Sequence, residues 1–296
     1  MPLITTRSAA SVRGLGFCQQ TGPRTSPISG YELWLDAADA TKFTYSSGSV
    51  VSRWTDKSAN GYFFEPSATT MAPSRTGTQN SKSTLIFDGV NDGLLSTSAT
   101  SVWKFLHDGT QNTVFLVYKD TTTPSTTPIT RTMLNTTGYT YDSITAGYPG
   151  YRSVTGSFIS GGTTFGTNYS YIYDSVIKSG QSYPANINAG SFPTTTPGAW
   201  GIITDLSDVN NATNSLRLTR YSNNSGYPNT ANSYNLGWTA GSTSSPLTPL
   251  SIGRINNAGD YDAFKGEIAE IIMYKRKLSD SEKDEMVTYL KTKWNI

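Results

Sequence analysis

The amino-acid sequence predicts an all-β fold, a sandwich of antiparallel sheets, for most of its 296 residues. From Tyr31 onward, short apolar or alternating runs recur between Gly, Pro, Asn and Asp residues, which is typical of strands joined by turns. The composition agrees, because 27 Gly and 14 Pro favour turns and 12% aromatic residues favour strands. A helical period appears only in the last segment.

The first 30 residues differ from the rest of the chain. Arg7, Arg13 and Arg24 are the charged side chains before Glu32, and Gly and Pro interrupt any regular pattern. We therefore expect residues 1–30 to form an extended arm, either a loose tail or an anchor that orders on a neighbouring subunit. The single cysteine, Cys18, lies in this arm and excludes an internal disulfide. Residues 31–296 are expected to form the sandwich domain.

Alternation of side chains defines the expected strands in chain order. Leu33 and Leu35 should share one face of the first strand, and Leu85 and Phe87 one face of a later strand. The run 113–119 is apolar on both faces, so that strand should be buried on both sides. Further strands are expected at Tyr169 to Ile177, Trp200 to Thr204, Leu216 to Tyr221 and Leu250 to Arg254, with Trp34, Trp54 and Trp200 in the core.

The C-terminal segment predicts a strand followed by a short helix. In the run from Gly266 to Tyr274, strict alternation places Ala269, Ile271 and Met273 on one face. The other face then carries Ile268, Glu270, Ile272 and Tyr274. Next, Ser279 and Glu282 have the spacing of a helix capping box. Leu278, Met286, Leu290 and Trp294 form an apolar stripe that should pack on the sandwich.

Charge and patterning exclude several classes of protein. The net charge is +2, and the only basic cluster is 275–277, so duplex nucleic-acid binding is not expected. The N-terminus lacks the apolar run of a secretory signal, and no stretch approaches the about 20 apolar residues of a membrane span. Charged residues make up 15%, against about 25% in an ordinary soluble domain. A surface of hydroxyl and amide groups suits extracellular or virion proteins.

Four blocks of sequence resemble concanavalin A-like lectin/glucanase domains of the laminin G-like type. They are Leu33-Trp-Leu-Asp-Ala-Ala-Asp39, Ser52-Arg-Trp-Thr-Asp-Lys-Ser-Ala-Asn-Gly61, Leu85-Ile-Phe-Asp-Gly-Val-Asn-Asp92, and Phe264-Lys-Gly-Glu-Ile-Ala-Glu-Ile-Ile-Met-Tyr274 with Leu278-Ser-Asp-Ser-Glu282. The resemblance spans residues 31–296 and implies a two-sheet jelly-roll with a short helix after the last strand. The start of the chain looks like that of tailed-phage structural proteins that carry such domains.

This resemblance implies a virion structural protein, a capsid decoration or a tail component, that displays a lectin-like sandwich on the virion surface. It would be made in the host cytoplasm without a signal peptide. Its partners would be other virion proteins bound through residues 1–30, a host-surface glycan, and further copies of the chain in a homo-oligomer, with neither nucleic acid nor membrane. The alternatives are a carbohydrate-binding module without a virion role and a glycoside hydrolase of the same fold.

The carboxylates predict no catalytic residue and hence no enzyme. Glycosidases of this fold align acids on one strand face, whereas Glu267 and Glu270 are three residues apart and should point to opposite faces. Asp260 and Asp262 follow a glycine in an expected turn. The only histidine, His107, should be an exposed loop residue.

The remaining candidates concern ligands. Laminin G-like domains often bind Ca²⁺, and Asp88, Asn91 and Asp92 are candidate oxygen ligands for it. The alternative is a turn whose side chains bond to their own backbone, as we also expect for Asp36, Asp39 and Asp56. No cofactor is required. Loop tyrosines offer surfaces for sugar rings; the candidates for glycan contact are Tyr139, Tyr148, Tyr151 and Tyr227.

Overall fold

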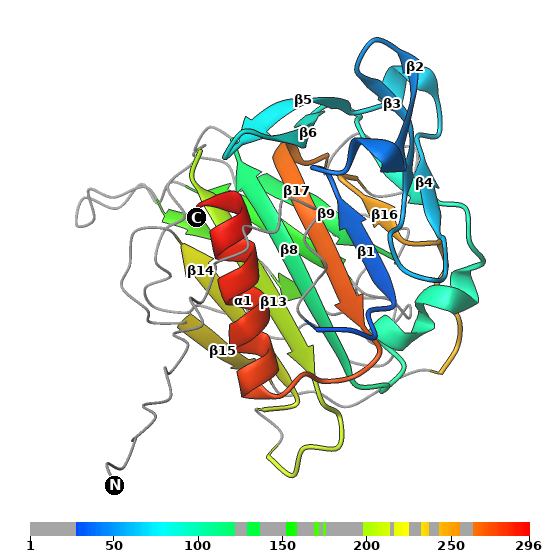
Figure 1. Ribbon diagram of the computed structural model, residues 1–296. Helices are drawn as coiled ribbons and strands as arrows, with labels where there is room; N and C mark the ends of the chain where they lie inside the picture. Colours follow the sequence, from blue (N-terminus) through cyan, green and yellow to red (C-terminus); the bar gives the residue numbers. More distant parts are fainter. Residues whose placement is uncertain are drawn as a thin grey trace, which may run out of the picture.

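The computed structural model describes residues 28–121, 129–136, 152–158, 169–171, 174–175, 198–213, 216–224, 232–236, 243–254 and 263–296. These residues form mainly antiparallel β-strands and one α-helix near the C-terminus (Figure 1), which confirms the all-β prediction and the closing helix. Nearly all of the expected arm, residues 1–27, lies outside the described part of the chain. Its role stays a prediction.

The elements are short, as the density of turn residues predicts. The strands are β1 (Leu33–Asp36), β2 (Phe43–Ser47), β3 (Val50–Thr55), β4 (Phe63–Glu65), β5 (Ser74–Gln79), β6 (Lys82–Asp88), β7 (Leu94–Ser96), β8 (Asn112–Asp120), β9 (Ile129–Asn135), β10 (Arg152–Phe158), β11 (Tyr169–Tyr171), β12 (Asp174–Ser175), β13 (Trp200–Ser207), β14 (Leu218–Asn224), β15 (Asn232–Leu236), β16 (Ser251–Ile252) and β17 (Lys265–Tyr274). The helices are the 3-10 turns η1 (Ala40–Lys42), η2 (Thr69–Met71) and η3 (Thr100–Leu106), and the α-helix α1 (Asp280–Trp294).

Strand β17 lies at the centre of the sheet. One edge pairs with β8, which continues to β13, β14 and β15, and the other edge pairs with β6 and then β1. From β6 the pairing passes through β5 and β3 to β4, β7, β16, β9 and β10. The sheet therefore curls into a half-barrel (Figure 1). Whether it is a two-sheet jelly-roll stays a prediction.

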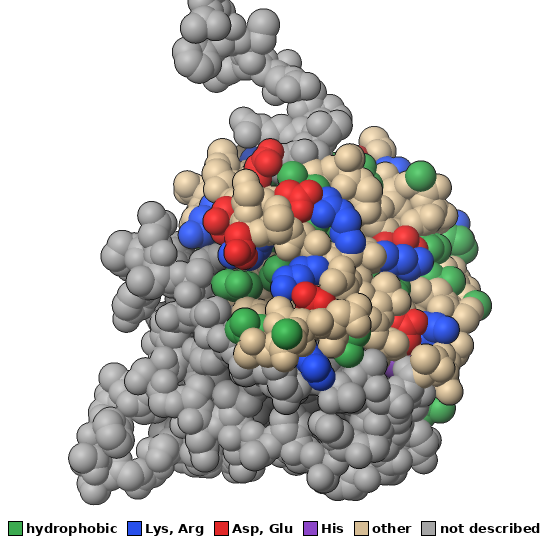
Figure 2. All heavy atoms as spheres, turned by 90° about the horizontal axis from the view of Figure 1, so that it is seen from below, with side chains coloured by type: hydrophobic (Ala, Val, Ile, Leu, Met, Phe, Trp, Pro, Cys, Tyr) green, Lys and Arg blue, Asp and Glu red, His purple; other side chains and the backbone are tan. Residues whose placement is uncertain are grey.

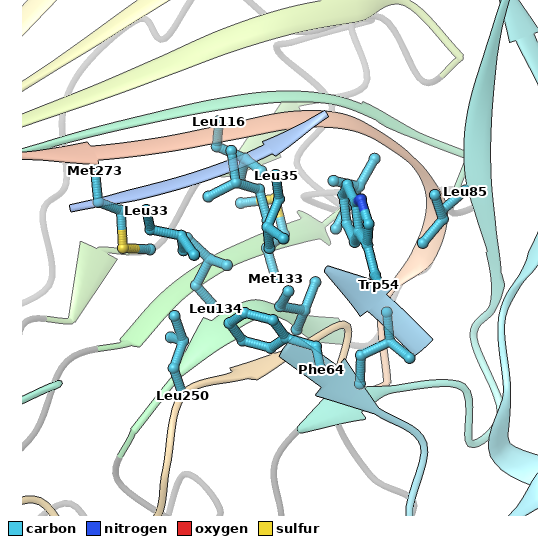
Figure 3. Close-up of a cluster of buried hydrophobic side chains, with 14 of the residues drawn as sticks. Leu33, Leu35, Trp54, Phe64, Leu85, Leu116, Met133, Leu134, Leu250 and Met273 are labelled. Atoms are coloured by element: carbon cyan, nitrogen blue, oxygen red, sulfur yellow. The ribbon is translucent and has the colours of Figure 1, made fainter. Parts of the chain in front are cut away.

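The inside of the curl holds the main hydrophobic core (Figure 3). Leu33 and Leu35 point into it from β1, and Leu85 and Phe87 point into it from β6, as their alternation predicts. Trp54 is fully buried in the same cluster. Burial of apolar side chains on this scale is the main source of stability in a domain of this kind.

Helix α1 covers the outer face of the sheet. Its Met286, Leu290 and Trp294 pack in a second cluster with Trp34 of β1 and Trp200 of β13. Strand β8 serves both clusters, since Val114, Leu116 and Tyr118 face the inner core while Phe115 and Val117 face the helix. The predictions of a doubly buried strand and of a packed apolar stripe are confirmed.

One detail of β17 differs from its expected alternation. Its register with β8 passes from Ile268 opposite Tyr118 directly to Glu270 opposite Val117, so Ala269 is an extra residue in a β-bulge. Ile268 consequently faces the inner core and Ala269 the helix, the reverse of the prediction. Side chains of β17 that precede the bulge therefore point to the opposite face of the sheet from the one that unbroken alternation predicts.

Both ends of α1 are capped. Ser279 Oγ accepts the backbone N–H of Glu282 at 3.3 Å, and the Glu282 carboxylate accepts the backbone N–H of Ser279 at 2.9 Å, which confirms the capping box. At the other end, the last residue of β5 and the turn that follows it supply donors. Gln79 Nε2 donates to the carbonyl of Trp294 at 2.8 Å, and Asn80 Nδ2 donates to that of Lys293 at 3.0 Å. These bonds tie the helix to the sheet.

Candidate functional site

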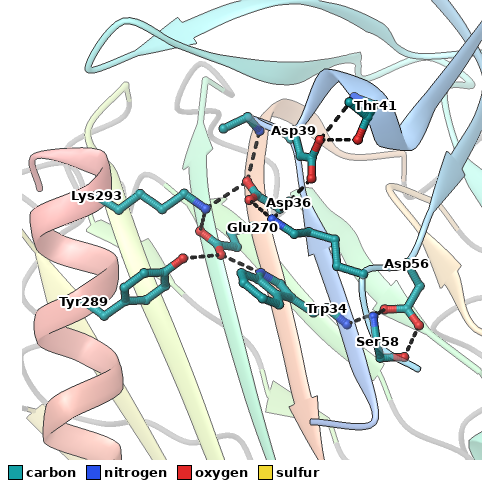
Figure 4. Close-up of polar contacts among 12 residues, drawn as sticks. Trp34, Asp36, Asp39, Thr41, Asp56, Ser58, Glu270, Tyr289 and Lys293 are labelled. Atoms are coloured by element: carbon teal, nitrogen blue, oxygen red, sulfur yellow. Dashed lines mark hydrogen bonds and ion pairs between the residues drawn. The ribbon is translucent and has the colours of Figure 1, made fainter. Parts of the chain in front are cut away.

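A buried cluster of charged groups lies between the sheet and α1 (Figure 4). Glu270 of β17 stands opposite Asp36 of β1 in the strand register. Lys293 of α1 reaches between them, with its Nζ 2.8 Å from Asp36 Oδ1 and 2.8 Å from Glu270 Oε2. Lys57 Nζ binds the other oxygen, Asp36 Oδ2, at 2.9 Å. The cluster thus joins β1 and β17, which are far apart in the sequence, to helix α1.

Glu270 has no exposed surface, and both of its oxygens are occupied. Trp34 Nε1 donates to Oε1 at 2.7 Å, and Trp294 Nε1 donates to Oε2 at 2.6 Å. Tyr289 adds a longer hydroxyl contact to Oε1 at 3.4 Å. A buried carboxylate is stable only with such a set of donors. The arrangement therefore fastens α1 to the sheet and leaves no free oxygen for a substrate.

Burial and charge act in opposite directions on the two carboxyl groups. Burial raises the pKa of Glu270, against the attraction of Lys293. Burial alone would also raise the pKa of Asp36, but Lys293 and Lys57 together hold it below its ordinary value. Asp36 was predicted to be a turn residue, and it does accept the Ala38 backbone N–H at 3.0 Å. Its ion pairs were missed.

Glu267 lies on the same face of β17 as Glu270, because the Ala269 bulge separates them. Its Oε1 binds Lys119 Nζ at 2.8 Å, and Lys119 lies over the ring of Trp200, which belongs to the cluster beneath α1. The prediction that the two glutamates point to opposite faces is wrong. It assumed an unbroken alternation, which the bulge interrupts.

The turn that follows β6 holds the candidate calcium ligands. Asp88 Oδ1 accepts the backbone N–H groups of Val90, Asn91 and Asp92 at 2.8, 3.2 and 3.4 Å. Asp92 Oδ2 accepts the N–H of Asp88 at 2.9 Å, and burial raises the pKa of Asp92 to about 6. These oxygens thus bond to their own turn. Calcium binding here stays a prediction.

His107 is buried, and the prediction of an exposed loop histidine is wrong. It follows η3 as the C-cap residue, and its Nε2 is 2.9 Å from the carbonyl oxygen of Ser244. Burial lowers the pKa of His107 below its ordinary value. The bond to a carbonyl favours the tautomer with its proton on Nε2.

Four tyrosines predicted to contact glycans, Tyr139, Tyr148, Tyr151 and Tyr227, lie outside the described residues. The described part instead presents Tyr45 of β2, whose exposed fraction is 39%. Its ring stacks on Phe43 at 6.2 Å between centroids, and Phe43 stacks on the buried Trp54 at 5.4 Å. The alternation of Phe43 and Tyr45 could have indicated this aromatic ladder, but nothing in the sequence marks its outer ring as exposed.

Arg75 of β5 lies beside this ladder. Its guanidinium is 5.0 Å from the centroid of Phe43, and Nη1 is 3.3 Å from the hydroxyl oxygen of Tyr45. Nε donates to the carbonyl of Ala37 at 2.8 Å. We call Tyr45 and Arg75 together the Tyr45 platform. The platform combines the exposed ring of Tyr45, which is supported by the stacked rings of Phe43 and Trp54, with the positive charge of Arg75, which these contacts hold in place.

None of the helices in the described part of the chain is long and apolar enough to cross a membrane. Nor does that part of the chain group three or more His, Cys, Asp or Glu residues in a way that would hold a metal ion.

No family model and no curated protein matches this chain. Among solved structures it is similar to the Trypanosoma rangeli sialidase in complex with 2,3-difluorosialic acid, at 12% identity and a TM-score of 0.49, over 90% of this chain and 34% of that one. It is also similar to the NanB sialidase of Streptococcus pneumoniae, at 13% identity and a TM-score of 0.37, over 68% and 26%. The chain thus spans about a third or less of the length of these sialidases.

The comparison contradicts the prediction that this protein is not an enzyme, because the solved structures it resembles are sialidases. The local argument for that prediction is wrong, because Glu267 and Glu270 share a face. At TM-scores below 0.5, the similarity transfers neither a substrate nor a catalytic residue to this chain.

Proposed function

We propose that the protein binds saccharides and that the Tyr45 platform is their contact surface. Sugars place their apolar C–H faces against aromatic rings, and a tyrosine adds a polar hydroxyl at the rim. The stacked ladder of Tyr45, Phe43 and Trp54 is the observation that supports this role. A ring held in place in this way loses little side-chain entropy when a ligand binds.

The surroundings of Tyr45 are consistent with this proposal. Strand β2 has no charged residue, and its Thr44, Ser46 and Ser47 are exposed like Tyr45. Hydroxyl groups both donate and accept hydrogen bonds, as sugar hydroxyls do. Figure 2 shows the face of the molecule away from β2, where acidic and basic side chains lie beside one another among uncharged groups.

The test is a glycan array probed with the full chain, followed by calorimetry on the best ligand. We expect Tyr45→Ala to weaken binding at least about tenfold, or ~1.4 kcal/mol, because the stacking surface is lost. Tyr45→Phe should keep most of the affinity, since the ring remains. Val90→Ala removes another exposed apolar side chain, on the turn between β6 and β7, and should have no effect.

Two outcomes would overturn the proposal. Binding to no saccharide on the array would remove the function, and full binding by Tyr45→Ala would remove the site. The bound saccharides should also be incubated with the protein and assayed for new reducing ends. Cleavage would show that the protein acts on its ligand as well as binding it.

The display of this domain on a virion surface, through residues 1–30, is part of the proposal. Its support is the charge-poor composition and the position of Ile28, whose carbonyl accepts the Tyr274 hydroxyl at 2.9 Å. An arm that precedes Ile28 would leave the domain beside α1. Deletion of residues 1–27 should leave a folded domain that no longer enters particles; normal incorporation would refute the anchor.

A jelly-roll arrangement with Ca²⁺ at Asp88, Asn91 and Asp92 is also proposed. The test is the melting temperature in calcium chloride and in a chelator. We expect calcium to raise the melting temperature of the wild type, and Asp88→Ala to abolish the rise. An identical melting temperature in both buffers would count against the metal.

A further inference from the structure

We infer that the saccharide recognised at the Tyr45 platform is anionic and that Arg75 binds its carboxylate or sulfate group. This inference rests on the proposed function, since it names the class of ligand for that site. It is carried by two observations on Arg75, its fixed position and the absence of an ion pair to it among the described residues.

The guanidinium of Arg75 is held on several sides. The backbone N–H of Arg75 donates to the carbonyl of Ser49 at 2.9 Å, which fixes the start of the side chain. Nε donates to the Ala37 carbonyl at 2.8 Å and Nη2 to the Ala38 carbonyl at 3.3 Å. The face of the group lies over Phe43. A cation fixed in this way needs little reorganisation to bind a ligand.

Arg75 forms no ion pair with any carboxylate in the described part of the chain. The carboxylates of the adjoining segment, Asp36 and Asp39, are both bound by Lys57, at 2.9 and 3.3 Å. Arg53, in the hairpin of β2 and β3, shows the contrast, because its Nη2 pairs with Glu65 at 2.7 Å. Among the described residues, Lys57 and Arg53 are thus paired with carboxylates, whereas Arg75 is not.

The donors of Arg75 match an oxyanion. A guanidinium has five N–H groups, and the contacts to Ala37, Ala38 and Tyr45 use one on each nitrogen. One N–H on each terminal nitrogen remains, which leaves two donors for a carboxylate or sulfate group. Since Nη1 also lies 3.3 Å from the Tyr45 hydroxyl, an anion bound there would bring its sugar ring next to the Tyr45 ring.

The test compares matched ligands by calorimetry with the full chain. One pair is an oligosaccharide of uronic acids and its neutral methyl ester, and a sulfated oligosaccharide with its desulfated form is the second pair. We expect the wild type to bind at least one charged form about 10–100-fold more tightly than its neutral partner, as hydrogen bonds to charged groups imply. Arg75→Gln should remove that preference by weakening the binding of the charged form.

Two variants serve as controls. Arg53→Gln removes an arginine from the same hairpin region, although a paired one, and should keep the preference. Arg75→Lys keeps the positive charge but not the planar guanidinium, and should keep part of the preference for the charged form. Arg75 also binds the carbonyls of Ala37 and Ala38, so circular dichroism must show that Arg75→Gln is folded. If it is unfolded, the test is made with Arg75→Lys and with the wild type at high salt, where the preference for the charged form should be lost.

The outcomes separate this inference from the proposed function. Equal affinity of the wild type for charged and neutral forms, with binding still lost in Tyr45→Ala, would overturn the anionic ligand and keep the site. A preference that persists in Arg75→Gln would assign the anion to another cation and overturn the inference as well. Binding to neither form of either pair would overturn this inference, while the glycan array decides the proposed function separately.

Discussion

A single buried glutamate shows how far residue-level reasoning extends. Glu270 interrupts the apolar run Ile-Ala-Glu-Ile-Ile, so a charged residue in a buried strand was visible in the sequence. Its need for partners follows from the cost of burying a charge. The partners themselves were not predictable, because Trp34 is 236 residues away and Lys293 is 23 residues away along the chain. Only the fold brings them together.

Glu270→Gln should destabilise the domain by about 3–5 kcal/mol, because Lys293 loses one of two buried counter-charges. The measurement is urea unfolding followed by tryptophan fluorescence. Glu285→Gln makes the same chemical change on the exposed face of α1 and should alter stability by less than about 0.5 kcal/mol. Equal effects of the two variants would contradict a structural role for the cluster.

His107 predicts a dependence of stability on pH. Its pKa is about 6.5 in the unfolded chain and lower in the folded protein, so the unfolded chain binds the proton more readily. The stability contributed by neutral His107 is complete above about pH 6.5 and is lost as the pH falls below that value. His107→Gln should flatten this part of the curve of unfolding free energy against pH. An unchanged slope would show that other groups cause it.

At the scale of elements, the sequence predicted strands and helix ends well and one register poorly. Alternation located β1, β6 and β8 and their buried faces, and the capping box located the start of α1. The bulge at Ala269 was not predictable, because an apolar run such as Ile-Ala-Glu-Ile-Ile fits either register when both faces are covered. The predicted faces of Ile268 and Ala269 were wrong for this reason.

Deletion of Ala269 should be tolerated better than deletion of Ile271. Without Ala269, Ile268 and Glu270 become neighbours and keep the faces that they now occupy opposite β8, at the cost of the 2.9 Å bond from Ala37 N–H to the Ala269 carbonyl. Without Ile271, every later side chain of β17 changes face. Circular dichroism and thermal melting of the two purified variants provide the measurement. The reverse order of stability would refute the bulge.

Helix α1 should depend on both the size and the N–H group of Trp294. Trp294→Ala should cost about 3–5 kcal/mol through the cavity it leaves. Trp294→Phe keeps most of the apolar surface but removes the donor to Glu270, and should cost about 1–3 kcal/mol. Chemical denaturation of both variants tests this order. If Trp294→Phe matched the wild type, the indole bond would contribute nothing.

At the scale of the whole molecule, the sequence predicted the class of fold but not its closure. The patterns of Leu33, Leu85 and Leu116 marked a common core, which the structure confirms. How the strands curl is decided by pairings such as β1 with β17 and β3 with β5, which join distant parts of the chain. The Tyr45 platform depends on the same closure, because Arg75 and Tyr45 come from different strands. Residue patterns alone do not specify such neighbours.

The cluster beneath α1 also has a consequence for how the chain matures. Trp34 is synthesised 236 residues before Glu270, its partner on β17. Contacts of such long sequence separation form slowly. On a ribosome, β1 therefore has no neighbour on its β17 edge until β17 and α1 have emerged. A chaperone that binds the chain before then would meet that edge open.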